Sequence, residues 1–406
     1  MTATPKGFRL HIGIFGRRNV GKSTLLNLVA GQEASIVSPT PGTTTDPVEK
    51  AMEFIPMGPV LWIDTAGIDD AGDLGGLRSD RARRIIDRTD LAILVFHREW
   101  GAYEQDLFAE FQRRRVPVVI VANKADLDSP GGAPAAGLPP GAAPVRMAAE
   151  RGDGLEDLRQ AILASAPADF INSPVLLRDL FKPGECLVLV TPIDKEAPKG
   201  RMILPQVQAL RDVLDGDGMA LICKETGLAG ALEKLEAPPA LVVTDSQAIE
   251  KVAAIVPEGI PVTGFSILYA RAKGDLAAFA RGAAAIDRLR DGDVVLVAES
   301  CTHHQEDDDI GRVKLPAWIR GKCGAKPEFR FLAGHDFPED LSGLALVLHC
   351  GACMTNRRAV LSRIARCQAA GKPIVNYGIA IAYCRGLLER ALAPFPEVLA
   401  AYRAGR

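Results

Sequence analysis

The chain has 406 residues, which at roughly 150 residues per domain is enough for two or three domains. Hydrophobic residues make up 48% of it and charged residues 24%, as in ordinary globular proteins, and no apolar run is long enough to span a membrane. The net charge of -2 argues against a broad nucleic-acid-binding face, and the first residues lack the apolar core of a signal peptide, so we expect a cytoplasmic protein that binds neither nucleic acid nor a membrane.

The first predicted elements are a strand, RLHIGIFG, and a helix, GKSTLLNLVAG, that ends at Gly31. Between them lies the pattern G-x-x-x-x-G-K-S, in which backbone N–H groups at a helix N-terminus bind phosphates. Lys22 adds a positive charge beside the β- and γ-phosphates, and the Ser23 hydroxyl can ligate Mg²⁺. The predicted phosphate-binding residues are Gly16, Asn19, Gly21, Lys22, Ser23 and Thr24.

Three further motifs exclude a chance glycine-rich turn. DTAG follows the apolar run PVLWI, so the Asp64 carboxylate lies at a strand end, where it can hold Mg²⁺ through water. NKAD follows the apolar run VPVVIVA, and there Asp126 can accept hydrogen bonds from the guanine N1 and N2 groups, which selects guanine over adenine. PGTTTD, residues 41–46, is typical of a switch segment. Together these segments predict a GTPase that binds GTP and GDP.

In their order and spacing, these motifs resemble the small GTPases related to the tRNA-modification and Era-type families, over about residues 7–166. The resemblance implies that Thr44 binds Mg²⁺, that Gly67 senses the γ-phosphate, and that the Ala149 N–H lies near the guanine, within the fifth motif MAAERGDG. Ala148 stands where the family usually has serine, which puts contacts at this end in doubt. The guanine-binding residues expected are Asn123, Lys124, Asp126 and Ala149.

Two residues bear on how GTP would be hydrolysed. Ile68 stands where Ras-like enzymes carry the glutamine that orients the attacking water, so hydrolysis must be organised differently and is expected to be slow. Asn19 matches the asparagine with which relatives hold a K⁺ ion, and such a cation offsets charge that develops on the phosphates. The alternative is that Asn19 only caps a turn. The predicted catalytic residues are Asn19, Lys22, Thr44, Asp64 and Gly67.

The middle of the chain alternates apolar runs, CLVLVTPI, MALIC and ALVVTD, with helix-like segments such as LPQVQALRDVLD. This alternation predicts a parallel sheet covered by helices. The segment contains no phosphate loop, histidine or carboxylate cluster, and Cys186 and Cys223 lie in apolar strands as core residues. Because it lacks catalytic content, we expect it to make contacts, and dimerisation is the preferred reading.

Two apolar runs in the last third end directly in candidate ligands: VVLVAES in CTHH, and LALVL in HCGAC. Ligands of open α/β sheets bind at the carboxyl ends of strands, so neighbouring strands would bring these side chains together. A third strand, PIVNYG, would add Asn376 and Tyr377. Thiolates and imidazoles suit zinc or an iron–sulfur cluster, and spacing leaves both open, beside a reading without metal. The candidate ligands are Cys301, His303, His349, Cys350 and Cys353.

The pair Cys-x-His and His-Cys-x-x-Cys, with residues 304–348 between them and a GTPase domain ahead, resembles the maturation GTPases of FeFe-hydrogenases. TPIDKEAPKGRMILPQVQ and SILYARAKGD extend the resemblance over essentially the whole chain. It implies a 4Fe–4S cluster on Cys301, Cys350 and Cys353, with His303 or, preferably, His349 near the fourth iron. It also implies a scaffold that receives a transient di-iron precursor from radical-SAM maturases and delivers it to the apo-hydrogenase.

The expected organisation is therefore α/β throughout: a P-loop GTPase domain, then two further α/β domains with mostly parallel sheets. The expected boundaries are 1–168 for the GTPase domain, 169–272 for a dimerisation domain and 273–406 for the iron–sulfur domain. One rival reading is a GTPase with a structural zinc that acts in RNA modification or ribosome assembly, which the near-neutral charge weighs against. Another is an iron–sulfur redox sensor that reports through GTP hydrolysis.

Overall fold

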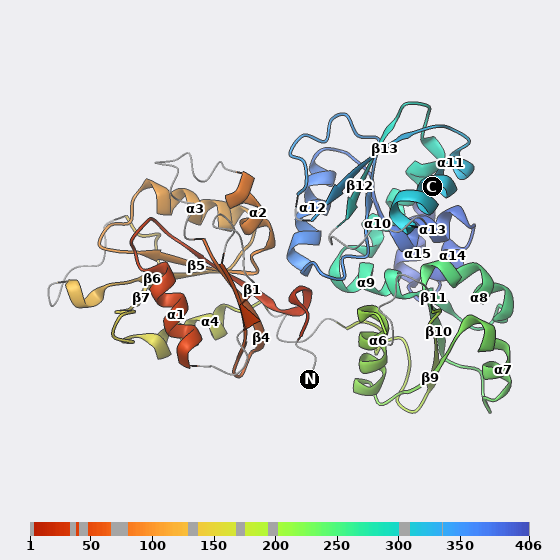
Figure 1. Ribbon diagram of the computed structural model, residues 1–406, viewed down its shortest axis with the longest axis horizontal. Coiled ribbons are helices and arrows are strands. Elements are labelled where there is room, and N and C mark those ends of the chain that lie inside the picture. Colours follow the sequence, from red (N-terminus) through yellow and green to blue (C-terminus); the bar gives the residue numbers. More distant parts are fainter. Residues whose placement is uncertain are drawn as a thin grey trace. The chain divides into compact units, whose positions relative to one another are not determined.

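The computed structural model describes most of the chain and divides it into two compact units, Met1–Ser173 and Pro174–Arg406 (Figure 1). No helix in the part of the chain that it describes is long and apolar enough to cross a membrane. The described residues are 4–32, 38–39, 48–65, 80–128, 137–167, 175–193, 202–299, 309–334 and 336–405.

The first unit is built on a seven-stranded sheet in the order β2-β3-β4-β1-β5-β6-β7. Adjacent strands in this sheet are parallel except for the β2–β3 and β3–β4 pairs, which are antiparallel. Every residue of β1 and β5 is buried, as expected of strands that are covered on both faces. The strands are β1 Leu10–Phe15, β2 Ser38–Pro39, β3 Val48–Phe54, β4 Gly58–Asp64, β5 Leu91–Phe96, β6 Val118–Ala122 and β7 Val145–Arg146.

Helices cover both faces of this sheet, α1 and α4 on one side and α2 and α3 on the other (Figure 1). Two separate apolar cores result, one that includes Leu25 and Ile162 and one that includes Ile85 and Phe111. Helix α1 runs one residue past its predicted end at Gly31. The helices are η1 Lys6–Phe8, α1 Lys22–Gln32, α2 Asp80–Arg88, α3 Ala102–Arg113, η3 Ala125–Leu127 and α4 Leu155–Ser165.

The second unit begins with a four-stranded parallel sheet in the order β11-β10-β8-β9. Its apolar core lies between the sheet and helices α7 and α8 and includes Val188, Leu228 and Val252. The elements are β8 Cys186–Val190, α6 Leu204–Asp215, β9 Met219–Cys223, η4 Glu225–Gly227, α7 Leu228–Glu233, β10 Leu241–Thr244, η5 Ser246–Ala248, α8 Ile249–Ile255, β11 Val262–Gly264 and α9 Phe265–Lys273.

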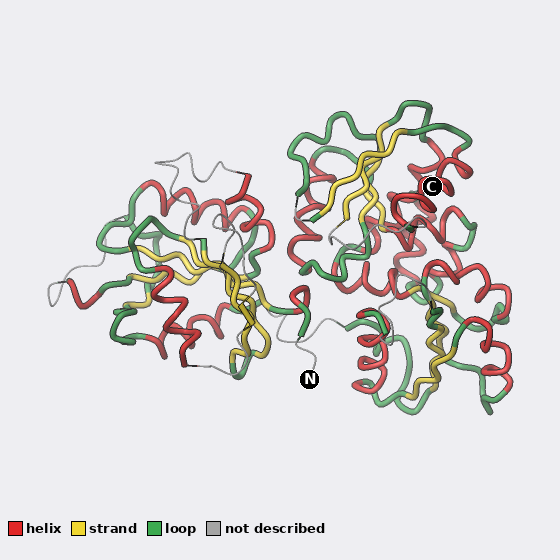
Figure 2. The backbone as a smooth tube through the Cα atoms, viewed as in Figure 1, coloured by secondary structure: helices red, strands yellow, loops and turns green. Residues whose placement is uncertain are grey.

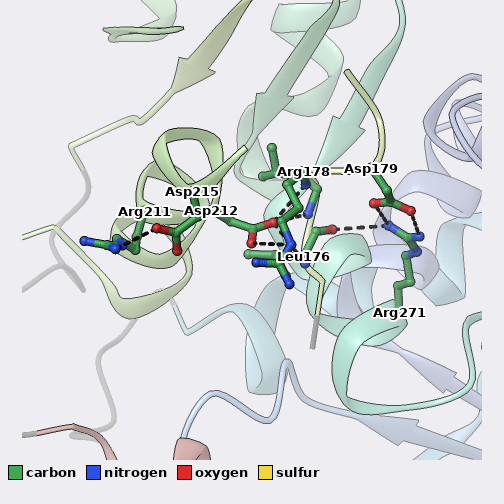
Figure 3. Close-up of polar contacts among 8 residues, drawn as sticks. Leu176, Arg178, Asp179, Arg211, Asp212, Asp215 and Arg271 are labelled. Atoms are coloured by element: carbon green, nitrogen blue, oxygen red, sulfur yellow. Dashed lines mark hydrogen bonds and ion pairs between the residues drawn. The ribbon is translucent and has the colours of Figure 1, made fainter. Parts of the chain in front are cut away.

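Polar contacts fix the segment that enters the second unit (Figure 3). The Asp212 carboxylate, in α6, accepts backbone N–H bonds from Leu176, Leu177 and Arg178 at 3.0, 2.7 and 2.9 Å. Arg271, in α9, donates to the Asp179 carboxylate at 2.9 Å through Nη1 and also through Nη2. Two helices thereby hold the entering chain from two sides.

The second unit continues with another parallel sheet, in the order β13-β12-β14-β15 (Figure 2). Helix α10 packs closely on β15, because a Cβ added at Gly282 would lie 2.0 Å from the Ile374 carbonyl oxygen. The elements are α10 Leu276–Ala283, η6 Ala284–Arg288, β12 Val294–Glu299, η7 Ile310–Lys314, α11 Leu315–Cys323, β13 Glu328–Ala333, β14 Leu346–His349, α12 Arg357–Ala369, β15 Ile374–Asn376, α13 Tyr377–Cys384, α14 Leu388–Leu392 and α15 Pro396–Ala404. The predicted fold class, a P-loop domain followed by further α/β structure with parallel sheets, is confirmed.

Candidate functional site

The phosphate loop joins the end of β1 to the start of α1. It needs left-handed backbone at three positions, with φ of 144° at Gly16, 63° at Asn19 and 94° at Gly21. A Cβ at Gly16 would lie 2.1 Å from the Val95 carbonyl oxygen, and one at Gly21 would lie 2.3 Å from Asn123 Nδ2. Both glycines are therefore required by conformation and by close approach, and the loop leaves its N–H groups at the start of a helix, where phosphates bind.

Two side chains at the start of α1 occupy the positions that phosphate and Mg²⁺ chemistry requires. Lys22 is buried, and its Nζ donates to the carbonyl oxygens of Gly16 at 2.5 Å and Arg17 at 2.9 Å, so its charge lies over the loop. The Ser23 hydroxyl donates to Asp64 Oδ2 at 2.7 Å. A hydroxyl beside a buried carboxylate suits a Mg²⁺ ion bound by the first directly and by the second through water.

The guanine end is held together by Asn123. Its Nδ2 donates to the Val20 carbonyl oxygen at 2.8 Å, and its Oδ1 accepts from the Ala149 N–H at 3.1 Å. One buried amide thus joins the phosphate loop, the NKAD segment and the fifth motif. Lys124 takes a left-handed φ of 62°. The predicted guanine-binding segments lie side by side.

Arg151 is a residue that sequence reasoning missed at this end. Its Nε lies 3.8 Å from Asp126 Oδ2, beside the carboxylate expected to read guanine. The Ala148 N–H, at the position where relatives have serine, donates to the Asp153 carbonyl oxygen at 3.1 Å and closes the turn that carries Arg151. The sequence signal for it is its place in the fifth motif, MAAERGDG.

Three predicted residues of the GTPase site lie outside the described residues. They are Thr44 and Gly67, which are expected to bind Mg²⁺ and sense the γ-phosphate, and Ile68, at the water-positioning site. Their roles stay predictions.

A second candidate site lies at the carboxyl edge of the last sheet. Strands β12 and β14 are neighbours, with Ala298 paired to His349, so the two strands that precede the predicted ligand segments end side by side. Cys301 and His303 follow β12 but lie outside the described residues. Cys350 and Cys353 follow β14, with Ala352 in left-handed backbone between them at a φ of 54°. No group of three metal-binding side chains occurs among the described residues, which do not include Cys301 or His303.

The two described thiols share one environment. Burial, together with the nearby Cys350 thiol, raises the pKa of the Cys353 thiol to about 11, while Lys273 opposes the shift. Metal coordination deprotonates thiols, so a bound metal would add positive charge to that of Lys273 and stabilise the thiolates. The Thr355 hydroxyl, two residues on, is buried and has no hydrogen-bond partner among the described residues.

His349 is placed differently from the sequence expectation. The buried ring donates through Nδ1 to the Cys350 carbonyl oxygen at 2.8 Å, and its Nε2 accepts from Arg363 Nη1 at 3.1 Å. Burial, with Arg363 beside it, lowers the pKa of His349 to about 3, so the ring is neutral. Because both nitrogens are engaged, His349 could bind a metal only after losing one of these bonds, and its role as fourth ligand stays a prediction.

Asn376 and Tyr377 also reach this edge, where both have structural partners. Asn376 caps α13 by accepting the Ile379 N–H at 2.9 Å and donates to the Ser266 carbonyl oxygen at 3.0 Å. The Tyr377 hydroxyl donates to Glu299 Oε1 at 3.4 Å, and burial raises the pKa of this phenol. Neither is free to act as a ligand without losing a contact.

Lys273 is a second residue that sequence reasoning missed. It ends α9, only 3% of its surface is exposed, and its Nζ reaches the turn that carries Cys350 and Cys353. Burial lowers the pKa of the Lys273 ammonium to about 7, while Cys353 and Cys350 oppose that shift. The sequence signal for Lys273 is the segment SILYARAKGD, which is part of the resemblance to the FeFe-hydrogenase maturation GTPases.

The fold and the first site define a P-loop GTPase followed by two further α/β segments. Residues 11–124 match the family model of the 50S ribosome-binding GTPase. Residues 176–274 match the hydrogen maturase F dimerization domain, and residues 277–394 match the hydrogen maturase F tetramerization domain. The chain belongs to the hydrogen maturase F family.

Curated relatives match only part of the chain. The tRNA modification GTPase MnmE of Parasynechococcus marenigrum is 42% identical over 159 residues, 38% of this chain and 33% of the relative. The GTPase Der of Bartonella tribocorum is 39% identical over 159 residues, again 38% and 33%. The chain thus spans about a third of the length of these relatives.

Solved structures resemble the chain weakly. A variant of Aquifex aeolicus Era bound to GDP·AlF4⁻ has 19% identity and a TM-score of 0.30, covering 53% of this chain and 93% of that one. The G domain of the T. maritima FeoB iron transporter has 22% identity and a TM-score of 0.28, covering 39% and 98%. TM-scores this low carry no argument about function.

Proposed function

We propose that the protein is a GTP-hydrolysing scaffold that binds a 4Fe–4S cluster and assembles or transfers the di-iron precursor of the hydrogenase active-site cluster to apo-FeFe-hydrogenase. The observation that carries the proposal is the pairing of β12 with β14, because the strand that precedes Cys301 in the sequence and the strand that precedes Cys350 and Cys353 end next to each other. Membership of the hydrogen maturase F family supports the same reading.

The GTPase part would bind guanine nucleotides with Mg²⁺. Lys22 would offset phosphate charge, Ser23 and Asp64 would hold the metal, and Asp126 would select guanine. The left-handed Asn19 lies inside the phosphate loop, which suits the proposed K⁺ site. Thr44 and Gly67 would complete the Mg²⁺ and γ-phosphate contacts.

The cluster would be held by Cys301, Cys350 and Cys353. Three soft thiolates fit a 4Fe–4S cluster, and a cluster bound in this way keeps one iron open to an exchangeable ligand. Because the ring nitrogens of His349 are engaged, the fourth position falls to His303, to a carboxylate such as Glu306, or to solvent. A weak fourth ligand suits a scaffold, since a di-iron unit must arrive and leave.

Partners follow from this role. Radical-SAM maturases would supply the di-iron precursor and the apo-hydrogenase would receive it, in the cytoplasm. Matches to a dimerization and a tetramerization domain support a homo-oligomer, with the first contact made by the middle segment. We propose domain boundaries near 168 and 272, of which the first lies close to the division between the two compact units.

Anaerobic purification followed by iron, sulfide and zinc analysis tests the proposal. We expect about four irons and four sulfides per chain after reconstitution, and loss of both in the Cys350→Ser variant. A colourless protein with one tightly bound zinc would contradict it. That result would favour the second candidate, a GTPase with a structural zinc in RNA modification or ribosome assembly, for which the match to a ribosome-binding GTPase model is the supporting observation.

A further inference from the structure

A buried lysine holds the turn that follows β14. Lys273 Nζ donates to the carbonyl oxygens of Ala352 at 3.0 Å, Cys353 at 3.1 Å and Thr355 at 2.9 Å. The lysine and its acceptors are 79 to 82 residues apart in the sequence, so this is a tertiary contact between α9 and the turn. The same turn carries both described thiols of the proposed cluster site.

The geometry selects the charged form of the lysine. Three acceptors within hydrogen-bonding distance require three N–H donors, which an ammonium has and a neutral amine lacks. The three acceptors thus favour the ammonium, against burial that lowers its pKa to about 7, and place a positive charge inside the protein beside Cys353. A buried charge of this kind is costly unless it is compensated, and here the three carbonyl dipoles and the face of the Tyr269 ring, 5.4 Å from Nζ, contribute to the compensation.

The turn itself needs support. Ala352 lies in left-handed backbone at a φ of 54°, which is unfavourable for a residue with a Cβ, and its carbonyl is one of the acceptors. A second contact runs between the same segments: Arg357 Nη1, at the start of α12, donates to the Ala272 carbonyl oxygen at 2.9 Å. The end of α9 and the turn are thus joined from both sides.

We propose that Lys273 is a positioning residue of the cluster site, which holds the turn from Cys350 to Thr355 in its ligating shape and places a fixed positive charge beside the thiolates. The inference rests on the proposed function for its cluster. Groups that hydrogen-bond to ligands orient them, and charges near an iron–sulfur cluster set its reduction potential. A nearby positive charge stabilises the more anionic, reduced state, so its removal should make the potential more negative.

The first arm of the test uses the protein without a cluster. Lys273→Met keeps much of the side-chain volume and removes the ammonium. Because the released turn should expose Cys353, we expect its thiolate to be alkylated by iodoacetamide at least tenfold faster in this variant. Rates are followed by peptide mass spectrometry and divided by the thiolate fraction obtained from their pH dependence, since loss of the ammonium raises the pKa of the thiol. Cys367, which is fully buried in α12, serves as the internal reference, because general unfolding would expose it as well. If the Lys273→Met variant exposes Cys367 as well as Cys353, the measurement is repeated with the Lys273→Gln variant.

The control is Lys372→Met. Lys372 precedes β15 at the opposite end of the strands, where its Nζ donates to the Ser342 carbonyl oxygen at 2.7 Å, so the substitution makes the same change of charge away from the turn. Its Cys353 alkylation rate should equal that of the unaltered protein.

The second arm uses the reconstituted protein and measures the midpoint potential of the cluster by EPR-monitored titration. Lys273→Met should shift it to a more negative value, and Lys372→Met should leave it in place. Unchanged alkylation of Cys353 together with an unchanged potential would overturn the inference. If the unaltered protein takes up no cluster, the proposed function fails, while the alkylation arm still decides whether Lys273 holds the turn.

Discussion

At the scale of single residues, Asp126 offers the sharpest test of nucleotide choice. Its carboxylate can accept from the guanine N1 and N2 groups, whereas an amide presents a donor to the same edge. Asp126→Asn should therefore weaken GTP binding on the order of a hundredfold, about 3 kcal/mol, and improve binding of xanthosine triphosphate. Titration with fluorescent nucleotide analogues measures both affinities.

Asp128→Asn is the matched control for that change. Asp128 lies two residues further on and pairs with Arg98 at 3.4 Å and His97 at 3.7 Å. Its substitution should leave the preference for guanine unchanged. Equal binding of ATP and GTP by the unaltered protein would remove the assigned role of Asp126.

Asn19 leads to a second prediction at this scale. If it holds a K⁺ ion against the phosphates, GTP hydrolysis should run at least tenfold faster in K⁺ than in Na⁺ at equal ionic strength, because the cation offsets charge in the transition state. Asn19→Ala should abolish the difference. A K⁺ effect that persists in this variant would show that the ion acts elsewhere, and hydrolysis assays in the two salts decide.

Glu49 makes partly buried ion pairs that should affect the acid stability of the first unit. Burial alone would raise its pKa, but Arg88 at 2.7 Å and Lys6 at 2.6 Å outweigh it and lower the pKa from 4.5 to about 2. A lowered folded-state pKa stabilises the fold above pH 4.5, and this contribution, about 3 kcal/mol at most, is lost as the pH falls through 2.

Glu49→Gln should accordingly lower the free energy of unfolding at pH 7 and flatten its dependence on pH between 4.5 and 2. Urea unfolding followed by tryptophan fluorescence measures both effects. Glu53→Gln is the control, since Glu53 is half exposed on the same strand and lies 3.9 Å from Arg9. An identical pH profile for the two variants would contradict the assignment.

At the scale of elements, β9 is the strand through which we expect two copies to associate. It is the last strand of its sheet, and its outer edge pairs with no strand among the described residues. Its inward backbone groups are used: the Met219 N–H donates to Glu185 and the Cys223 carbonyl accepts from Thr191, each at 2.9 Å. Because successive residues of a strand direct their backbone N–H and C=O groups to opposite sides, those of Ile222 point away from β8, toward the open edge of the sheet. The Ile222 side chain is 42% exposed.

A charge at this edge should oppose association. Ile222→Lys is expected to weaken the dimer at least tenfold, about 1.4 kcal/mol, as measured by light scattering over a dilution series. Ile255→Lys makes the same change at the end of α8, at a side chain of similar exposure, 39%. This variant should show the same apparent molar mass as the unaltered protein at every dilution. A larger effect from Ile255→Lys would place the contact on another face.

At the scale of the whole molecule, the two compact units predict separable activities. Cys350→Ser should lose the cluster and keep GTP hydrolysis within twofold, because residues 16–154 carry the complete set of nucleotide motifs inside the first unit. Lys22→Ala should lose nucleotide binding and keep the cluster. Paired assays of iron content and hydrolysis test this, and loss of GTP binding in a folded Cys350→Ser protein would refute it.

The sequence by itself determined the nucleotide site and the fold class. Phosphate and guanine are recognised by short contiguous segments at strand ends, so Gly16, Lys22, Asn123 and Asp126 could be assigned by motif and spacing alone. The parallel sheets were also predictable, because strands buried on both faces read as continuous apolar runs, as in VVLVAES and LALVL.

Only the tertiary structure decided how the second site is built. That β12 lies beside β14 depends on strand pairing across almost fifty residues, which no local pattern specifies. Arg363 donates a hydrogen bond to His349, and Lys273 donates to the turn after β14. Both contacts join residues that are distant in the sequence, and folding brings them together. A side chain can bind a metal only when its lone pair accepts no hydrogen bond from a neighbouring residue. Which residues become its neighbours depends on tertiary packing and cannot be derived from the local sequence.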